Sequence, residues 1–329
     1  MKIISLFDTS ISSSNLGDQI IMDAVKSHLT EMFRDSLFIP IQTHDVISKN
    51  SYRYIRNSDL KFVGGTNLLS SNMNSYSQWK INLFDSIFIQ DITLMGVGWW
   101  QYQNPPNAYS RMLYKRVLSN KNMHSVRDSF TEQQLRAAGI SNVINTACPT
   151  MWRLTDDHCK DIPKAKQKAV VVTFTDYNQD NVNDKKLYDL LSKEYEAIYF
   201  WTQGPADYEY MQSIGGSKVK YIPPSLQALD HILATLDCDY IGTRLHAGIR
   251  SLQHKRRSLI LAVDNRAKEI SKDTELPVVD RKDIAGIQEW ITRSEGTRIR
   301  LPLEQIKAWK DQFFSESKAA AASQFVSSI

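Results

Sequence analysis

The chain has 329 residues, of which 42% are apolar and 23% are charged, a composition that is ordinary for a soluble globular protein. Its 40 basic and 36 acidic residues give a formal net charge of +4, which offers no argument for a nucleic-acid-binding protein. The length is sufficient for two α/β domains, and the mild basic excess is compatible with a small anionic substrate.

The start of the chain and the cysteines exclude further classes. The first residues form one short apolar run followed by polar residues, unlike a secretory signal peptide. No window approaches the roughly 20 apolar residues of a transmembrane helix. The three cysteines, Cys148, Cys159 and Cys238, are widely spaced and form no C-x-x-C motif. This pattern indicates reduced thiols in a cytoplasmic protein, with neither a disulfide framework nor a metal site.

In the first half of the chain, short apolar runs alternate with helical patterns. Lys2–Phe7 predicts a buried parallel strand, and a polar loop containing Asn15 and Gly17 leads into a helix from about Asp18. A strand, a polar loop and a helix N-terminus can cradle an anion, although Ser and Asn also simply build turns and caps. Further strands are predicted at Leu37–Ile41, Leu60–Val63, Ser86–Gln90, Thr93–Val97 and Met123–Val126, and a helix at Pro105–Leu118.

Two of these strands end in small residues. Leu60–Val63 runs into Gly64-Gly65-Thr66-Asn67, and Thr93–Val97 runs into Gly98-Trp99-Trp100. Glycines at a strand end let the backbone approach a ligand or turn sharply. The two tryptophans either line a sugar-binding cleft or belong to the core or a domain interface.

Met123–Val126 delivers Arg127 and Asp128 just before a helix. We expect Ser129 to cap that helix, because Glu132 three residues later fits a capping box, and Gly139 to end it. An Arg at the end of a strand can bind an anion. The alternatives for Arg127 are a structural pair with Asp128 and a surface cation.

The second half repeats the alternation after a polar, lysine-rich stretch between Met151 and Lys168, which predicts a domain boundary. Strands are predicted at Ala169–Phe174, Ala197–Trp201, Val219–Ile222 and Ser258–Val263, and helices at Lys185–Glu194, Ser225–Leu236, Ile284–Thr292 and Leu303–Phe313.

The segment Tyr240–Ile249, YIGTRLHAGI, has the strongest chemical signature. A strand at Tyr240 gives way at Gly242 and Thr243, so that Arg244 and His246 arrive where a strand passes into a helix. Sites in open α/β sheets gather at such carboxyl ends. Arg offers a planar fork for a carboxylate or phosphate, and His can exchange a proton near neutral pH. The alternative is a surface Arg beside a core His.

The alternation in both halves predicts an α/β fold with two Rossmann-like, doubly wound domains that face a central cleft. We assign residues 1–160 to an N-terminal domain, 161–300 to a C-terminal domain and 301–329 to a terminal helix and tail.

The motifs and their order resemble the polysaccharide pyruvyltransferase family over roughly residues 1–290. They are Asn15-Leu16-Gly17-Asp18, Gly64-Gly65-Thr66-Asn67, Gly96-Val97-Gly98, Val126-Arg127-Asp128, Gly242-Thr243-Arg244-Leu245-His246 and Asp264-Asn265-Arg266. Two positions depart from the family pattern. Ala247 replaces a frequent Gly, and Asp264–Lys268 reads DNRAK in place of a Tyr-Asp-x-Lys type segment.

The resemblance implies a GT-B-like fold and a transferase without a cofactor. Its donor would be phosphoenolpyruvate, and its acceptor a sugar of a cell-surface polysaccharide (an exopolysaccharide) or of the lipid-linked precursor. The product would be a pyruvate ketal, with release of phosphate.

The resemblance also implies roles for particular residues. His246 is expected either as the acid or as the group that assists the leaving phosphate. Arg244 acts beside it, and Asp18 or Asp128 is the expected base. The donor would be bound by Arg127, Arg244 and His246, by Gly242 and Thr243, and by Arg266 or Lys268 as a further cation. The acceptor would bind near Asn15, Asn67, Trp99 and Trp100.

Two rival functions stay open at this point. A GT-B glycosyltransferase would use the same arginines for the diphosphate of a sugar nucleotide, and a binding or scaffold protein would have lost the chemistry. Peripheral contact with the inner face of the cell membrane and self-association as a homo-oligomer are further hypotheses.

Overall fold

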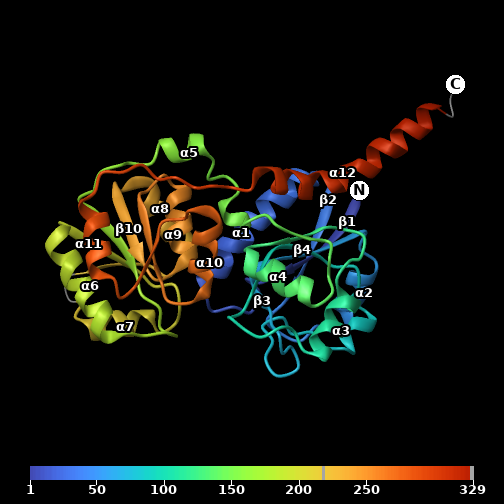
Figure 1. Ribbon diagram of the computed structural model, residues 1–329, viewed down its shortest axis with the longest axis horizontal. Helices are drawn as coiled ribbons and strands as arrows, with labels where there is room; N and C mark the ends of the chain where they lie inside the picture. Colours follow the sequence, from blue (N-terminus) through green and yellow to red (C-terminus); the bar gives the residue numbers. More distant parts are fainter. Residues whose placement is uncertain (217–218, 327–329) are drawn as a thin grey trace. The chain divides into compact units, whose positions relative to one another are not determined.

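The computed structural model describes residues 1–216 and 219–326, and for residues 315–326 it describes the backbone alone. It contains two parallel six-stranded sheets flanked by helices (Figure 1). Contacts divide the chain into two compact units. The first unit comprises Met1–Asp8, Val25–Trp152 and the chain from Pro302, and the second comprises Thr9–Ala24 and Arg153–Leu301. The predicted fold class, two Rossmann-like α/β sheets, is confirmed.

The sheet of the first unit has the strand order β2-β1-β3-β4-β5-β6, and every pairing is parallel. Its strands are β1 (Lys2–Asp8), β2 (Ser36–Gln42), β3 (Leu60–Leu69), β4 (Thr93–Trp99), β5 (His124–Val126) and β6 (Val143–Asn145). The helical segments are α1 (Leu16–Met32), α2 (Lys49–Arg56), η1 (Asp85–Ile87), α3 (Ala108–Val117), α4 (Ser129–Ala137), η2 (Pro149–Met151) and α12 (Leu303–Val326).

Right-handed crossovers decide which helices cover which face of this sheet. From β1 the chain crosses to β2 at one edge of the sheet, and from β2 it proceeds in the opposite direction toward β6 at the other edge. Because of this reversal, α1 lies on one face and α2, α3 and α4 lie on the other. The terminal helix α12 joins the face of α1. Trp309 of α12 packs edge-on against Phe62 and Trp152, with ring centroids 6.1 and 5.7 Å apart.

Two local predictions in the first unit are wrong. Ser86–Gln90 does not form a strand, because the buried carboxylate of Asp85 accepts from the Asn82 amide at 2.7 Å and closes the short helical turn η1. Ser129 does not cap α4. Asp128 is the N-cap, and its Oδ1 accepts from the Thr131 amide at 2.7 Å. Ser, Asp and Asn all favour this position, so the sequence pattern could be placed one residue too late.

The sheet of the second unit has the order β12-β11-β10-β7-β8-β9 and is also parallel. Its strands are β7 (Ala169–Thr173), β8 (Ala197–Trp201), β9 (Lys220–Ile222), β10 (Cys238–Gly242), β11 (Ser258–Ala262) and β12 (Val278–Asp280). Its helices are α5 (Asp156–Lys160), α6 (Asn181–Glu194), α7 (Asp207–Ile214), α8 (Leu226–Thr235), α9 (Leu245–Gln253), α10 (Asn265–Thr274) and α11 (Ile284–Thr292).

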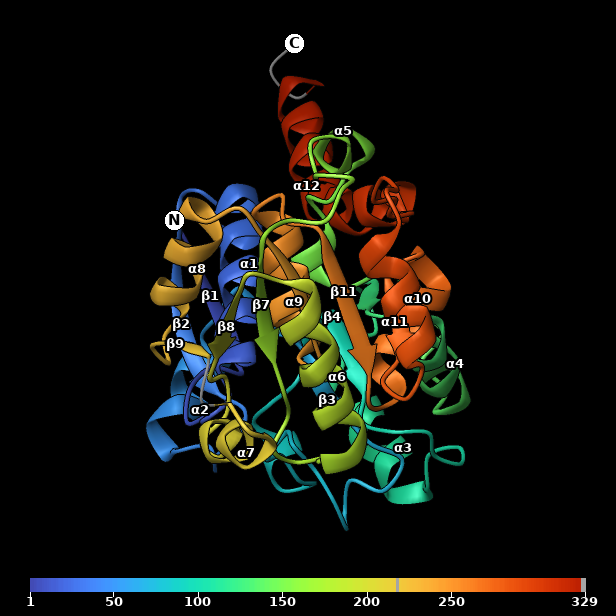
Figure 2. The same cartoon turned by 90° about the vertical axis from the view of Figure 1, so that its left-hand side faces the viewer.

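Helices cover both faces of this second sheet, with α6 and α11 on one side and α8, α9 and α10 on the other (Figures 1 and 2). The central strands β7 and β10 are buried along their whole length, as the unbroken apolar run of β7 predicts. In their parallel register Gly242 lies beside Thr173. The loops that follow β7 and β10 therefore leave the sheet at the same edge.

The contact-based units differ from the division predicted from the sequence in three places. The loop after β1 and the first half of α1, Thr9–Ala24, group with the second unit, and α12 groups with the first. The change from one unit to the other after the first sheet falls between Trp152 and Arg153, a little before the predicted boundary. Residues 327–329 of the predicted tail lie outside the described residues.

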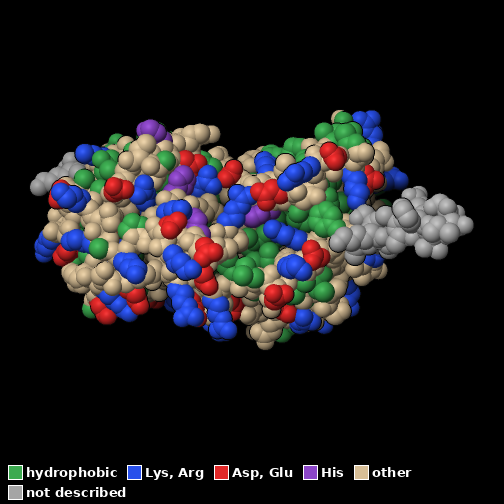
Figure 3. Space-filling model, turned by 90° about the horizontal axis from the view of Figure 1, so that it is seen from above, with side chains coloured by type: hydrophobic (Ala, Val, Ile, Leu, Met, Phe, Trp, Pro, Cys, Tyr) green, Lys and Arg blue, Asp and Glu red, His purple; other side chains and the backbone are tan. Residues whose placement is uncertain are grey.

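Surface and cysteine features agree with the composition. Acidic and basic side chains are interspersed over the face drawn in Figure 3. In the part of the chain that the structure describes, no helix is both long and apolar enough to cross a membrane. The three cysteines all lie within the described residues, are buried and form no disulfide. Burial raises the pKa of the Cys148 thiol, which makes it a poor nucleophile.

Candidate functional site

The turn between β10 and α9 is held against the end of β7. A Cβ on Gly242 would lie 2.4 Å from the Thr173 hydroxyl oxygen, so only glycine fits there. The Thr243 amide donates to the Thr173 carbonyl at 2.9 Å, and the Arg244 amide to the Thr173 hydroxyl at 3.3 Å. The neighbouring strand thus fixes this turn and places Arg244 at the N-cap position of α9.

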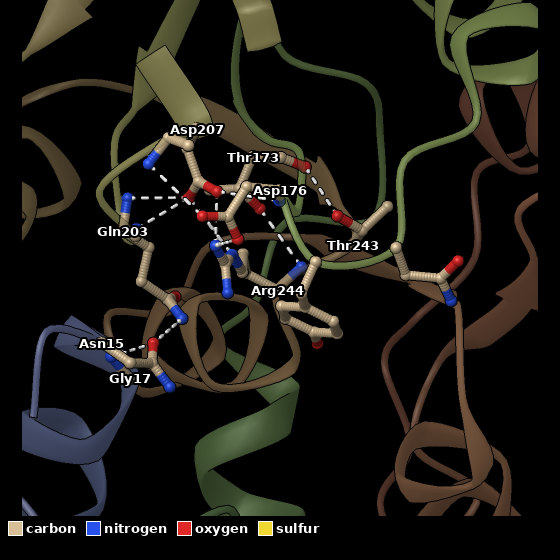
Figure 4. Close-up of polar contacts among 12 residues, drawn as sticks. Asn15, Gly17, Thr173, Asp176, Gln203, Asp207, Thr243 and Arg244 are labelled. Carbon is tan, nitrogen blue, oxygen red and sulfur yellow. Dashed lines mark hydrogen bonds and ion pairs between the residues drawn. The ribbon is translucent and has the colours of Figure 1, made fainter. Parts of the chain in front are cut away.

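The side chain of Arg244 reaches carboxylates on two other loops (Figure 4). Its Nε donates to Asp207 Oδ2 at 3.2 Å and its Nη2 donates to Asp207 Oδ1, which forms a two-pronged ion pair. Nη2 also donates to Asp176 Oδ1 at 3.0 Å. Arg244 is 4% exposed and Asp207 is fully buried. One buried guanidinium therefore lies against two carboxylates.

Asp207, the first residue of α7, ties three strand ends together. Its Oδ2 accepts from the amides of Gln203 and Gly204 at 3.1 and 2.8 Å, and its Oδ1 accepts from the Asp176 amide at 3.1 Å. Burial raises the pKa of Asp207, and the Arg244 guanidinium opposes that shift. The loops after β7, β8 and β10 are cross-braced through this one carboxylate.

His246 lies in the first turn of α9, two residues after Arg244, and is 6% exposed. Its position follows from the braced turn, since α9 begins at Leu245. Arg244 and His246 are two residues apart in sequence, and both therefore lie at the carboxyl edge of the second sheet.

Tyr177 lies between two arginines. Its ring centroid is 5.2 Å from Arg244 Cζ and 5.7 Å from Arg266 Cζ, and its hydroxyl accepts from Arg266 Nη2. Arg266 also binds Asp264, through Nε at 2.9 Å. Lys268 lies two residues further along α10, is half-exposed and pairs with Asp280 at 3.1 Å. Of the two predicted late cations, Arg266 is the one that shares a neighbour with Arg244.

Asn15 belongs to a chain of hydrogen bonds in the second unit (Figure 4). Its Oδ1 accepts from the Gly17 amide at 3.1 Å and from Gln203 Nε2 at 2.8 Å. These two donors fix the orientation of both amides, which leaves Gln203 Oε1 buried without a partner among the described residues. Asp18, in the first turn of α1, accepts from the Ser13 hydroxyl at 2.6 Å.

Arg127 follows β5 in the first unit and is 1% exposed. Its Nε donates to Asp128 at 3.1 Å and its Nη1 to Asn67 Oδ1 at 2.8 Å. A Cβ on Gly98 would lie 2.3 Å from Arg127 Cζ, so the guanidinium rests on a glycine of β4. Nη2 is buried and has no hydrogen-bond partner among the described residues.

The strand that carries Asn67 is irregular at this point. β3 shifts register after Thr66, and Thr66 has a φ of +113°, which a β-branched residue rarely adopts. Such strain persists where the surrounding structure imposes it, often at functional sites. The Gly-Gly-Thr-Asn segment singled out in the sequence thus places Asn67 against Arg127.

The two tryptophans have different environments. Trp99 is fully buried in the core, and its indole N–H donates to Gln103 at 3.0 Å, so it has no surface to offer an acceptor. This is the core placement that the sequence left open as the alternative. Trp100 is partly exposed and stacks on Tyr76 at 3.8 Å between ring centroids. Of the two tryptophans, only Trp100 has exposed surface on which a sugar ring could stack.

A model of the polysaccharide pyruvyl transferase family matches residues 15–265, well over half of the chain. The chain belongs to that family. The resemblance drawn from the sequence motifs is therefore confirmed. The matched residues include the polysaccharide pyruvyl transferase motifs around Asn15, Arg127, Arg244 and His246 and end just before Arg266 and Lys268.

Solved structures with the same fold are only distantly similar to this chain. The S. aureus MnaA–UDP structure matches with a TM-score of 0.56 and 14% identity, covering 98% of this chain and 97% of that one. Methanocaldococcus jannaschii UDP-GlcNAc 2-epimerase in complex with UDP-GlcNAc and UDP matches with a TM-score of 0.53 and 11% identity, covering 97% of this chain and all of that one. These likenesses establish a GT-B-like fold. No curated protein matches the chain.

Sequence reasoning missed three residues of the second unit, the buried Gln203 and Asp207 and the partly exposed Asp176. A signal for Gln203 and Asp207 existed in the segment Thr202-Gln203-Gly204-Pro205-Ala206-Asp207, where a glycine after a strand precedes an acidic residue at a helix start. Its partner Arg244 is 37 residues away, so the sequence alone did not connect them. Among the described residues, no group of three His, Cys, Asp or Glu side chains is placed to hold a metal ion.

His124, which the sequence places beside the strand end of Arg127, is a core residue. Its Nδ1 accepts from the Leu94 amide at 3.3 Å and its Nε2 contacts the Ser119 carbonyl at 2.8 Å, which fixes the neutral Nε2–H tautomer. Burial lowers the pKa of His124 to about 4. This histidine connects strands instead of exchanging protons with a ligand.

Proposed function

We propose that this family member transfers the pyruvyl group of phosphoenolpyruvate to two hydroxyls of a sugar, in a cell-surface polysaccharide or its lipid-linked precursor. The observation that carries the proposal is Arg127, whose buried guanidinium holds Asn67 and Asp128 and retains one nitrogen without a partner among the described residues. A buried unpaired donor is costly, and an anionic ligand would satisfy it. The family assignment supplies the chemistry of that ligand.

Phosphoenolpyruvate suits guanidinium groups because it carries a carboxylate and a phosphate. Arg binds either group through two parallel hydrogen bonds. We propose Arg127 and Arg244 as donor-binding residues, with Gly242 and Thr243 shaping the turn that holds Arg244. Arg266 is our choice for the further cation over Lys268, because it shares the Tyr177 ring with Arg244.

The reaction balances without a redox partner. Protonation of C3 of the donor makes C2 electrophilic, one sugar hydroxyl adds to C2, and a second hydroxyl then displaces the phosphate. The methyl group gains one proton, and the two hydroxyls together release two, one of which leaves with the phosphate. General acid–base catalysis of such steps typically contributes about 10²–10⁴-fold. We propose His246 as the acid.

The two candidate bases carry different structural duties. Asp128 caps α4 through Thr131 and binds Arg127, so deprotonating a substrate would disturb a helix start. Asp18 lies at the start of α1 and accepts from the Ser13 hydroxyl at 2.6 Å. We therefore favour Asp18 as the base and Asp128 as a residue that positions Arg127.

The proposed acceptor-binding residues are Asn15, Asn67 and Trp100. Amides can bind sugar hydroxyls, and the partly exposed Trp100, already stacked on Tyr76, offers an aromatic face for a sugar ring. A lipid-linked acceptor would bring the protein to the inner face of the membrane. Flotation with liposomes containing such a lipid would test this, and a protein left wholly in the unbound fraction would contradict it.

The function is tested by titrating the protein with phosphoenolpyruvate beside a panel of sugar nucleotides. We expect phosphoenolpyruvate to bind and Arg127→Ala to weaken binding by about 2–5 kcal/mol, because a buried charge partner is removed. His246→Ala should spare binding and abolish phosphate release in the presence of acceptor sugars, followed by phosphorus NMR.

Matched variants separate these effects from general charge changes. Arg136→Ala removes an arginine of the same unit that is half-exposed and pairs with Glu132, and His231→Ala removes an exposed histidine. Both should behave as wild type. Binding of a sugar nucleotide alone, without phosphoenolpyruvate, would show a glycosyltransferase and reject the pyruvyl donor.

A further inference from the structure

The guanidinium of Arg244 has two edges that can each bind a carboxylate or phosphate through two hydrogen bonds. Asp207 occupies the edge formed by Nε and Nη2. The other edge is formed by Nη1 and Nη2. Asp176 lies on that second edge through a single contact with Nη2, at 3.0 Å. Nη1 makes no hydrogen bond within the described residues.

Asp176 and Asp207 differ in how firmly they are held. Asp207 is fully buried and accepts from three backbone amides besides Arg244. The side chain of Asp176 is 20% exposed, and among the described residues its second oxygen accepts from the Ala206 amide alone, at 3.3 Å. Asp176 belongs to the loop between β7 and α6, beside the 56%-exposed Tyr177. The Asp207 contact is thus built into the fold, whereas the Asp176 contact lies at the surface.

Charge counting separates the two carboxylates further. Asp207 alone neutralises Arg244, and Asp176 gives the three side chains a net charge of −1. A second carboxylate is therefore not needed to compensate the buried guanidinium. It does, however, cover the edge to which an incoming anion would bind, and it repels that anion.

We propose that Asp176 is an internal anion that occupies the ligand-binding edge of Arg244 and must be displaced when the anionic donor binds. This inference rests on the proposed function for the identity of the donor, but not for the competition itself. Asp207 holds the guanidinium in place while the incoming anion replaces Asp176 on the edge formed by Nη1 and Nη2. Asp176 thereby sets the affinity and the charge selectivity of the site, because a weakly charged ligand cannot displace it.

The test is a titration of the whole protein and of Asp176→Asn with phosphoenolpyruvate, and separately with inorganic phosphate. Asparagine keeps the size of Asp176 and can still accept from the Ala206 amide, so the loop should remain folded. We expect Asp176→Asn to bind the anions about tenfold more tightly than wild type, and the gain to shrink as salt rises. In the double variant Asp176→Asn/Arg244→Ala the gain should vanish, since it acts through Arg244.

The control is Asp157→Asn, which makes the same change of net charge at a 92%-exposed side chain. It should leave both affinities unchanged. Equal or weaker anion binding by Asp176→Asn, or a gain that survives in the double variant, would overturn the proposal. If phosphoenolpyruvate binds no variant while phosphate binds Asp176→Asn more tightly, the donor assignment fails and the competition stands. If neither anion binds any variant, both are wrong.

Discussion

Arg127 and Arg244 occupy equivalent places in the two units but differ in the number of carboxylates around them. Each follows a short parallel strand. Arg127 immediately precedes the N-cap residue of α4, and Arg244 is itself the N-cap residue of α9. Arg127 contacts one carboxylate and one amide and keeps a buried nitrogen without a partner in the described chain. Arg244 contacts two carboxylates.

The difference shows that an arginine at a strand end is not by itself an anion site. What decides is how much of its charge the fold has already compensated. The charge of Arg127 is matched by the single carboxylate of Asp128, and its buried Nη2 lacks a partner in the described chain, so an anion can bind there directly. Arg244 has one carboxylate more than its charge requires and has to exchange Asp176 for an anion. The following changes test this comparison.

The largest effect is expected from Asp207→Ala. It leaves Arg244 buried with only the surface-held Asp176 and removes the acceptor for three amides, which should lower the free energy of unfolding by about 3–5 kcal/mol. Urea denaturation measures the loss, and amide exchange should place it in β10 and α7. Asp189→Ala, at a half-exposed carboxylate paired with Lys185, is the control. An unchanged midpoint would mean that Asp207 does not brace the site.

Acid should weaken the surroundings of Arg127 through His124, at the start of β5. The folded-state pKa of about 4 lies below the ordinary value of 6.5. Between these two pH values the unfolded chain therefore binds a proton at His124, and the folded chain does not. The free energy of unfolding should therefore fall as the pH drops from 6.5 toward 4, by about 3 kcal/mol in total. Amide exchange of β5 at pH 7 and 5 would report it, and His124→Gln should flatten the dependence. A slope unaffected by this substitution would assign it to other groups.

Gly98→Ala tests the shape of the Arg127 site without touching its charge. The new methyl group would lie 2.3 Å from Arg127 Cζ and force the guanidinium to move, at a cost of about 1–3 kcal/mol in stability. Phosphoenolpyruvate binding should weaken as well. Gly296→Ala, where the nearest atom beyond the chain neighbours is 3.7 Å away, should change neither quantity. Normal binding by Gly98→Ala would show that the position of Arg127 is unimportant.

The smallest effect is expected from Thr66→Gly. Glycine adopts a φ of +113° without strain, so we expect a gain of up to about 1 kcal/mol in stability, reduced by the lost side chain. The price is a looser Asn67, and the affinity for phosphoenolpyruvate should fall slightly. Thermal denaturation and the donor titration measure the two effects. A destabilised variant would mean that the Thr66 side chain matters more than the strain.

The short chemical motifs were visible in the sequence because each lies within a few consecutive residues. Residue type at a strand end was enough to recognise three motifs: the glycines before Asn67, the Arg-Asp pair after β5 and the R-L-H segment after β10. The partners of these motifs could not be recognised in the same way. Asp207 and Asp176 lie 37 and 68 residues from Arg244, and Asn67 lies 60 residues from Arg127. Trp99 and Trp100 are neighbours in sequence, yet Trp99 is the last residue of the fully buried strand β4, whereas Trp100 lies just beyond the strand and is partly exposed.

The sequence by itself determined the α/β class, the order of most elements and the family, because apolar periodicity and strand-end motifs are local properties. Only the tertiary structure decided which charges meet. The assignment of Thr9–Ala24 to the second unit, the two carboxylates on Arg244 and the unpartnered nitrogen of Arg127 all depend on contacts between distant segments. Electrostatic compensation is a sum over neighbours in space, and a linear pattern does not contain that sum.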